Sequence, residues 1–223
     1  MSGTWVVFEG GDGVGKTTQI DLLAAWLRGL GPDVVVTREP GGTELGRELR
    51  AAIMHGGHVA PRAEALLYAA DRAHHIHTLV APALDRGAVV VQDRYLDSSI
   101  VYQGGARALG DGVEEISLWA TEGALPDLTV VLDMAPAADR MARDLDRVER
   151  ETAEHAAAIR QGFLDLAARA PERYAVVDAA RPVAEVFADV SDAVGAVLVP
   201  DAVVESSAAV PPMQGGIEPW GTP

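Results

Sequence analysis

One short motif constrains the fold of this 223-residue chain more than any other feature. Residues 10–17 read GGDGVGKT and fit G-x-x-x-x-G-K-[ST], a loop that binds nucleotide phosphates. Such a loop needs a strand before it and a helix after it. The apolar run at 4–9 and the helical pattern at 18–27 meet both needs. Lys16 is also the only lysine of the chain, so the sequence predicts an α/β fold built around a nucleotide site.

The predicted loop supplies three kinds of positive group. Glycines let backbone N–H groups converge on phosphate oxygens, the following helix adds its positive end, and Lys16 adds a full charge. The hydroxyl of Thr17 can hold Mg²⁺. We expect the phosphate-binding residues to be Gly10, Gly11, Asp12, Gly13, Val14, Gly15, Lys16, Thr17 and Thr18.

Strand-like and helical segments alternate along the chain. Uninterrupted apolar strands separated by helices are typical of a parallel sheet covered on both faces. We predict five strands, at 6–9, 34–38, 88–93, 128–133 and 174–178. We predict helices at 16–30, 43–54, 61–86, 112–123, 136–143, 150–170 and 182–198. The expected fold is a doubly wound α/β domain.

The composition limits the partners and the compartment. A formal charge of −15 argues against nucleic acid or an acidic membrane surface as a partner, because phosphate backbones need basic patches. The chain has no cysteine, which fits a cytoplasmic protein. The first strand begins so soon after Met1 that we expect no signal peptide, and no apolar run is long enough to span a bilayer.

The composition changes after residue 199. Residues 200–223 hold five of the 13 prolines and neither lysine nor arginine. We therefore predict a folded domain at 1–199 and a disordered tail at 200–223. Trp220 could instead be a docking residue within that tail.

Charged residues follow two of the predicted strands. Ligands of open parallel sheets bind at the carboxyl ends of strands. Arg38 is therefore expected to point toward the phosphates, and Asp93 to face Mg²⁺ directly or through water. Arg94 could clamp a phosphate with two parallel hydrogen bonds. An exposed arginine in a polar turn and a structural Asp–Arg pair are the alternative interpretations.

Two residues of the predicted 61–86 helix suit a nucleobase. Tyr68 and Arg72 are four positions apart and share one helix face. The ring can stack on a base while the guanidinium donates hydrogen bonds to its carbonyl groups. Taken alone, a tyrosine at this position is more often a residue of the hydrophobic core.

Taken together, these motifs resemble the bacterial thymidylate kinase family. The resemblance covers roughly residues 3–197 and is carried by six segments in the family's order. They are FEGGDGVGKTTQ at 8–19, REPGGT at 38–43, ADR at 70–72, DRYLDSSIVYQG at 93–104, LPDLTVVLD at 125–133 and DRVE at 146–149.

The resemblance implies a nucleoside monophosphate kinase fold with strand order 2-3-1-4-5 and a short lid. It also implies a reaction. The enzyme would transfer the ATP γ-phosphoryl group to dTMP with Mg²⁺, giving dTDP, and would form a homodimer. Lys16 and Arg94 would be catalytic, and Thr17 and Asp93 would hold the metal. The dTMP-binding residues would be Asp12, Arg38, Pro40, Tyr68, Arg72, Arg94, Ser99, Tyr102 and Gln103. Tyr102 would crowd the place of a ribose 2′-hydroxyl.

The chain departs from the family pattern in two places. Many relatives carry phenylalanine where Tyr68 stands. The lid segment at 139–145 is shorter than usual by about two residues, and Gly13 stands where eukaryotic members carry a P-loop arginine. The transition-state cation must then come from the lid. Arg143 is the first candidate and Arg147 the second, with Arg140 and Arg150 also available.

Three alternatives to this activity remain at the level of sequence. The chain could phosphorylate a different nucleoside monophosphate, since base choice rests on few side chains. It could be a P-loop binding module without an acceptor, although Arg38, Arg72 and Arg94 argue against that. It could also be a homologue that binds nucleotides without turning them over.

Overall fold

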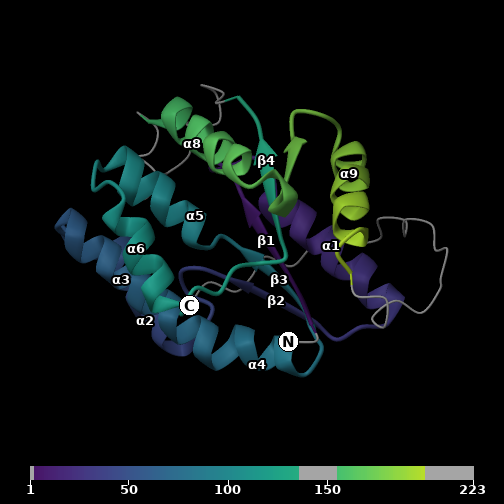
Figure 1. Ribbon diagram of the computed structural model, residues 1–223, viewed down its shortest axis with the longest axis horizontal. Helices are drawn as coiled ribbons and strands as arrows, with labels where there is room; N and C mark the ends of the chain where they lie inside the picture. Colours follow the sequence, from purple (N-terminus) through teal and green to yellow (C-terminus); the bar gives the residue numbers. More distant parts are fainter. Residues whose placement is uncertain (1–2, 136–154, 199–223) are drawn as a thin grey trace.

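A five-stranded parallel sheet forms the centre of the computed structural model, which describes residues 3–135 and 155–198 (Figure 1). The strands run in the order β2-β3-β1-β4-β5, which confirms the predicted order. Their bounds are β1 Thr4–Glu9, β2 Val34–Arg38, β3 Val89–Asp93, β4 Leu128–Asp133 and β5 Tyr174–Asp178. All five predicted strands are therefore present, with ends that shift by two residues at most.

Helices cover both faces of the sheet (Figure 1). One face is covered by α1 Lys16–Leu30 and α9 Val183–Gly195, which contact each other. The remaining helices of the described residues are α2 Glu44–His55, α3 Pro61–His75, η1 Ile76–Val80, α4 Ala81–Asp85, α5 Leu96–Ser99, η2 Ile100–Ala106, α6 Gly112–Ala120, α8 Ala156–Arg169 and η4 Pro171–Arg173.

The central strand β1 is buried along its whole length and divides the core in two. Successive side chains of a strand point to opposite faces of the sheet. Val6 and Phe8 accordingly belong to a cluster with Leu23 of α1, whereas Trp5 and Val7 belong to a cluster with η1 and α4 on the other face. A strand buried on both faces has no polar alternation, which explains its continuous apolar sequence.

The predicted helices differ from the observed ones in two respects. The segment 61–86 is divided into α3, a π-helical turn and α4. A second helical segment, α5 followed by the π-helix η2, lies at 96–106, where we predicted none. The predicted helix at 136–143 and the predicted tail at 200–223 lie outside the described residues.

The carboxyl ends of three neighbouring strands meet at one edge of the sheet. Phe8 of β1 and Arg38 of β2 both pair with Asp93 of β3. Glu9, Asp93 and Arg94 therefore come together where β1 enters the phosphate loop. Across the described residues, no helix is both long and apolar enough to cross a membrane.

Candidate active site

The phosphate loop connects β1 to α1 and needs glycine at two positions. Gly10 has φ 131° and would place a Cβ only 2.6 Å from the carbonyl oxygen of Leu132. Gly15 has φ 98° and caps the N-terminus of α1. Since only glycine adopts these angles without strain, the backbone can bend into a phosphate cradle here.

Lys16 begins α1 and folds back over the loop. Its Nζ donates to the carbonyl oxygens of Gly10, at 3.1 Å, and Gly11, at 2.8 Å. Burial, with repulsion from Arg94, lowers the pKa of Lys16 to about 8. A bound phosphate would replace these carbonyl contacts with a full negative charge.

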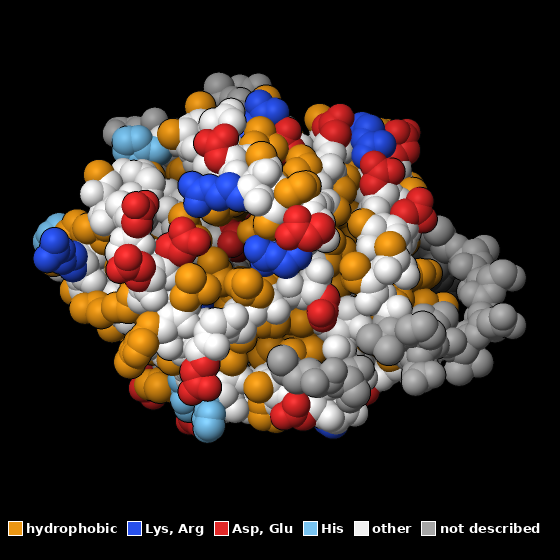
Figure 2. Space-filling view, viewed as in Figure 1, with side chains coloured by type: hydrophobic (Ala, Val, Ile, Leu, Met, Phe, Trp, Pro, Cys, Tyr) orange, Lys and Arg blue, Asp and Glu red, His pale blue; other side chains and the backbone are white. Residues whose placement is uncertain are grey.

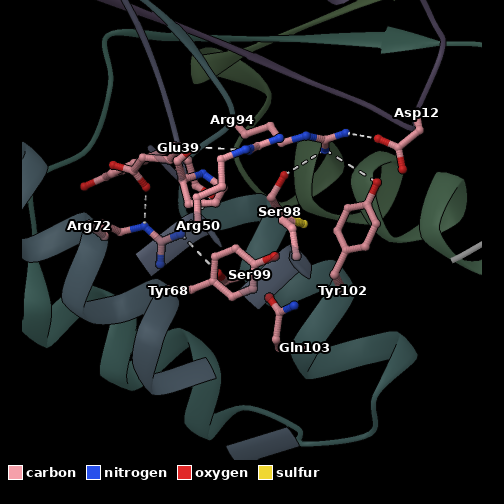
Figure 3. A pocket seen from close by; sticks show the side chains of 13 residues that line it. Asp12, Glu39, Arg50, Tyr68, Arg72, Arg94, Ser98, Ser99, Tyr102 and Gln103 are labelled. Atoms are coloured by element: carbon pink, nitrogen blue, oxygen red, sulfur yellow. Dashed lines mark hydrogen bonds and ion pairs between the residues drawn. The ribbon is translucent and has the colours of Figure 1, made fainter. Parts of the chain in front are cut away.

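Arg94 reaches over the same loop from the end of β3. Its backbone is left-handed, with φ 66°, an uncommon conformation for a residue other than glycine. The guanidinium donates to the carbonyl of Gly10 at 3.1 Å, to Ser98 at 3.0 Å and to the carboxylate of Asp12 (Figure 3). Burial opposes its charge, but the phenol of Tyr102 and nearby acids outweigh burial and raise the pKa of Arg94 well above its usual value. Arg94 is therefore a cation at the mouth of the phosphate loop.

Glu9 lies beside Arg94, and we predicted no role for it from the sequence. It is fully buried and accepts hydrogen bonds from the backbone N–H groups of Tyr95, at 2.8 Å, and Ser98, at 3.1 Å. The Ser98 hydroxyl donates to its second oxygen at 2.7 Å. Burial and nearby Asp97 raise the pKa of Glu9 to about 7. Glu9 thus caps α5 from a distant part of the chain.

A pocket opens beside the loop between α2, α3 and the α5–η2 segment (Figure 3). It brings together almost all of the predicted substrate residues. Those that line it are Asp12, Pro40, Tyr68, Arg72, Arg94, Ser99, Tyr102 and Gln103. It also contains five residues that we did not predict: Glu39, Arg50, Met54, Tyr95 and Ser98. Arg38 is the exception, since it is exposed at the end of β2 and is not among the lining residues.

Arg72 forms the inner end of this pocket and is 2% exposed. Its Nε donates to Glu39 at 2.9 Å, and its terminal nitrogens donate to Ser117 at 3.0 Å, to Ser99 at 3.0 Å and to the backbone carbonyl of Tyr95 at 3.2 Å. Within the described residues these contacts use four of the five N–H donors. The guanidinium is therefore held rigidly, and one N–H remains for a ligand.

A second row of buried groups holds Glu39, the ion-pair partner of Arg72, in place. The other oxygen of Glu39 lies 2.8 Å from Nδ1 of His75. Nε2 of the same ring lies 2.7 Å from the hydroxyl of Thr37. Glu39 is 4% exposed, and a buried carboxylate needs such partners. The chain Thr37–His75–Glu39 therefore fixes the position of Arg72.

The metal ligands expected from the sequence have a suitable setting. Oδ1 of Asp93 is buried and has no hydrogen-bond partner among the described residues. Thr17 lies in the first turn of α1, after Lys16. The described residues contain no group of three or more His, Cys, Asp or Glu side chains that could hold a metal. The two residues therefore suit Mg²⁺ that takes its other ligands from phosphate and water.

The two lid candidates, Arg143 and Arg147, lie outside the described residues. Among the residues that we failed to predict, Glu39, Tyr95 and Ser98 stand inside motifs that carry the family resemblance, so the motifs themselves were a signal. Arg50 and Met54 carry no comparable signal, because an arginine and a methionine on an amphipathic helix are common.

Comparison with known proteins identifies the relatives of this chain. The family model for thymidylate kinase matches residues 8–190. A thymidylate kinase of Clavibacter michiganensis subsp. michiganensis is 60% identical over 195 residues, which are 84% of this chain and 92% of the relative. One of Leifsonia xyli subsp. xyli is 57% identical with the same coverage. The crystal structure of thymidylate kinase from Ehrlichia chaffeensis is 28% identical, with a TM-score of 0.75 over 87% of this chain and 100% of that one.

Proposed function

This chain belongs to the thymidylate kinase family and transfers the ATP γ-phosphoryl group to dTMP, and from that premise we propose which of its residues carry the reaction. The observation that supports the assignment best is a single pocket. It joins a cation beside the phosphate loop, Arg94, to a tyrosine and a rigid arginine at the base end, Tyr68 and Arg72. This spacing suits a molecule with an anionic end and a planar polar end.

We place the 5′-phosphate of dTMP against Arg94. Asp12 already occupies that guanidinium, and it is 44% exposed and free to turn away. Substrate phosphate would take its place and form the stronger charge-assisted bonds. Arg38 remains a second phosphate ligand in this proposal if its exposed side chain turns toward the pocket.

We place the thymine between Pro40 and Tyr68, with Arg72 at its carbonyl edge. Ser99 and Gln103 lie nearby on α5 and η2. Tyr102 packs edge-on against Phe163 and carries the Arg94 guanidinium 5.4 Å from its ring centre. A ring fixed in this way leaves little room for a ribose 2′-hydroxyl.

On the donor side, the phosphate loop and Lys16 bind the ATP phosphates. Phosphoryl transfer depends on positioning and charge neutralisation rather than on covalent catalysis. Thr17 and Asp93 would hold Mg²⁺, which neutralises charge on the phosphate oxygens when it is bound. Lys16 aligns the transferring group. Since residue 13 is glycine, a second cation from the segment that contains Arg143 and Arg147 completes the charge balance.

A coupled assay with ATP, Mg²⁺ and each nucleoside monophosphate tests the function. We expect dTMP to give the highest kcat/KM and ribonucleotides to give little product. A higher kcat/KM with dCMP, dGMP or dAMP would replace the proposed substrate. The absence of turnover with every monophosphate would instead leave a nucleotide-binding homologue.

We propose a homodimer as the assembly. Helices α3 and α6 pack on each other, and each exposes a large apolar side chain. Trp119 of α6 is 81% exposed and Leu66 of α3 is 54% exposed. Hydrophobic side chains gather over α6 and the helices beside it (Figure 2). Such apolar surface is typical of protein interfaces. Trp119→Glu should therefore yield a monomer in sedimentation experiments, and an unchanged mass would place the interface elsewhere.

We also propose a cytoplasmic enzyme whose folded unit ends near residue 199. A chain without cysteine suits a reducing compartment. The composition of residues 200–223 supports a tail that takes no part in catalysis. A chain ending at Val199 should then keep the turnover and melting temperature of the full chain.

A further inference from the structure

A buried ion pair lies behind the base end of the pocket. Glu64 of α3 is fully buried, and Nε of Arg107, which follows η2, lies 2.9 Å from its Oε1. A terminal nitrogen of Arg107 donates to Oε2 at 3.2 Å. Nε2 of Gln103 also donates to Oε1 of Glu64, at 3.2 Å. Gln103 lines the pocket, whereas Glu64 and Arg107 are not among its lining residues, so Gln103 lies between the pocket and the pair.

This arrangement decides which way the amide of Gln103 faces. A side-chain amide has a donating NH₂ end and an accepting oxygen end, whereas a carboxylate only accepts. Since Glu64 is the carboxylate of an ion pair, the NH₂ end must face it. The amide oxygen then faces away from Glu64, and Figure 3 shows it on the side of Tyr68.

The backbone around Gln103 reduces its freedom to turn. The side chain is 3% exposed and stands in the π-helical segment Ile100–Ala106. Such segments are rare and occur frequently at functional sites. The carbonyl of Gln103 accepts a hydrogen bond from the N–H of Leu109 at 3.2 Å, which holds the loop after η2 against the helix.

We propose that Glu64 is a positioning residue for base recognition, because it fixes Gln103 so that the pocket presents an amide oxygen to the pyrimidine. This inference rests on the proposed function. Thymine carries an N–H at ring position 3 and a carbonyl at position 4. The Gln103 oxygen suits the first, and the remaining N–H of Arg72 suits the second.

Cytosine reverses both groups, with an unprotonated ring nitrogen at position 3 and an amino group at position 4. It would face acceptor with acceptor and donor with donor. A buried site built for hydrogen bonds discriminates strongly against a ligand that leaves its groups unpaired. The fixed amide therefore selects thymine over cytosine, although Glu64 touches neither base.

A purely structural role for Glu64 makes a different prediction. The ion pair joins α3 to the end of η2, so its loss could loosen the pocket as a whole. Both nucleotides would then bind more weakly by the same factor. The ratio of the two affinities separates this role from the positioning role.

The first experiment uses Glu64→Gln in the full chain. We would measure dTMP and dCMP dissociation constants by calorimetry without ATP, so that catalysis does not enter. An amide at position 64 can donate as well as accept, which allows Gln103 to turn over. We expect dTMP to bind about tenfold more weakly, the loss of one buried hydrogen bond, while dCMP binds as well as before or better.

The control and the second variant complete the test. Asp33→Asn removes an exposed ion pair with Arg86, 3.0 Å long, and should leave both affinities unchanged. The single variant Gln103→Leu should lose the preference for dTMP. Adding Glu64→Gln to that variant should not change the ratio of the dTMP and dCMP affinities any further.

Three results would overturn the proposal. They are an equal loss for both nucleotides in Glu64→Gln, a Glu64→Gln effect on the ratio that persists beside Gln103→Leu, and a Gln103→Leu variant that keeps the parental ratio. The measurement on Gln103→Leu tests the proposal even if the Glu64→Gln variant fails to fold. A parental protein without preference for dTMP would contradict the proposed substrate instead, so the two failures are distinguishable.

Discussion

The two ends of the acceptor pocket are built in opposite ways. At the base end, Arg72 is 2% exposed and Glu39 4%, and each holds the other in place through fixed partners. At the phosphate end, the side chain of Arg94 is 18% exposed and that of Asp12 44%. Among the residues that the structure describes, Nζ of Lys16 there bonds only to carbonyls of its own loop.

The difference separates specificity from turnover. Buried groups that already satisfy each other cannot rearrange cheaply, so the base end recognises one pattern of donors and acceptors. The contacts at the phosphate end are ones that phosphate oxygens can replace. We therefore propose that the phosphate end exchanges its partners during each catalytic cycle, whereas the base end keeps them.

Lys16→Ala should give the largest effect and should act only on the phosphate end. The transferring phosphoryl group loses its fixed positive partner, so we expect kcat to fall about 10³-fold. The dTMP dissociation constant should stay within a few-fold, because other residues form the acceptor pocket. Steady-state kinetics and calorimetry measure the two quantities. A variant with near-parental kcat would contradict the assignment of the donor site.

The lid arginines should give the second largest effect. An arginine that stabilises the transferring phosphoryl group can contribute ~10³–10⁵ in kcat. We expect Arg143→Ala to lower kcat at least a hundredfold, with only a few-fold change in the KM for dTMP. Arg147→Ala is the matched variant. If each enzyme keeps more than half of the parental kcat, neither arginine supplies the missing cation.

Arg72→Ala should damage the base end in both binding and stability. The loss of a buried polar partner costs about 1–3 kcal/mol, or roughly 5–150-fold in dTMP affinity. Glu39 would also lose its cation, so the melting temperature should fall. Asp12→Ala is the control at the phosphate end, where an exposed ion pair contributes at most about 1 kcal/mol. Equal melting temperatures for the two variants would remove the contrast between the ends.

Most of this fold follows from local sequence. The five strands are apolar runs, whereas their order in the sheet was predicted only together with the family resemblance. The α5–η2 segment could not be predicted in the same way, because its first turn is capped by Glu9 from β1. That capping carboxylate lies 86 residues before Tyr95, so no periodicity near residue 96 reports it.

The site was predictable where a residue acts through its own chemistry. Lys16, Tyr68 and Arg94 belong to this class. Glu39 and Glu64 act through other side chains, and only the folded pocket reveals what they hold. Arg38 illustrates the reverse case, since its place at a strand end suggested a pocket residue that the structure leaves exposed.

The pH dependence of ATP use tests the phosphate end without a substitution. The pKa of Lys16 lies at about 8 in the ligand-free protein, because burial disfavours its charge. The cation binds phosphate and the neutral amine does not. The kcat/KM for ATP should therefore be level below pH 8 and fall about tenfold per pH unit above it, since this quantity reports the free enzyme.

Lys16→Arg is the control for that profile. A guanidinium keeps its charge throughout this range, so the decline above pH 8 should disappear whatever the absolute rate. A decline that survives the substitution would come from another group. The base end should show no matching change, and dTMP affinity should stay level between pH 8 and 9.

Tyr68→Phe should give the smallest effect and sharpens the account of the base end. The aromatic ring that stacks on the base is retained, and no hydrogen bond of the phenol is found among the described residues. The substitution should therefore change the dTMP dissociation constant by less than about 0.5 kcal/mol. Calorimetry with dTMP measures it, with Tyr68→Ala as the variant that removes the ring. A loss as large as that of Arg72→Ala would mean that the phenol itself recognises the base. The fixed pair of Gln103 and Arg72 would then not be sufficient to define the substrate.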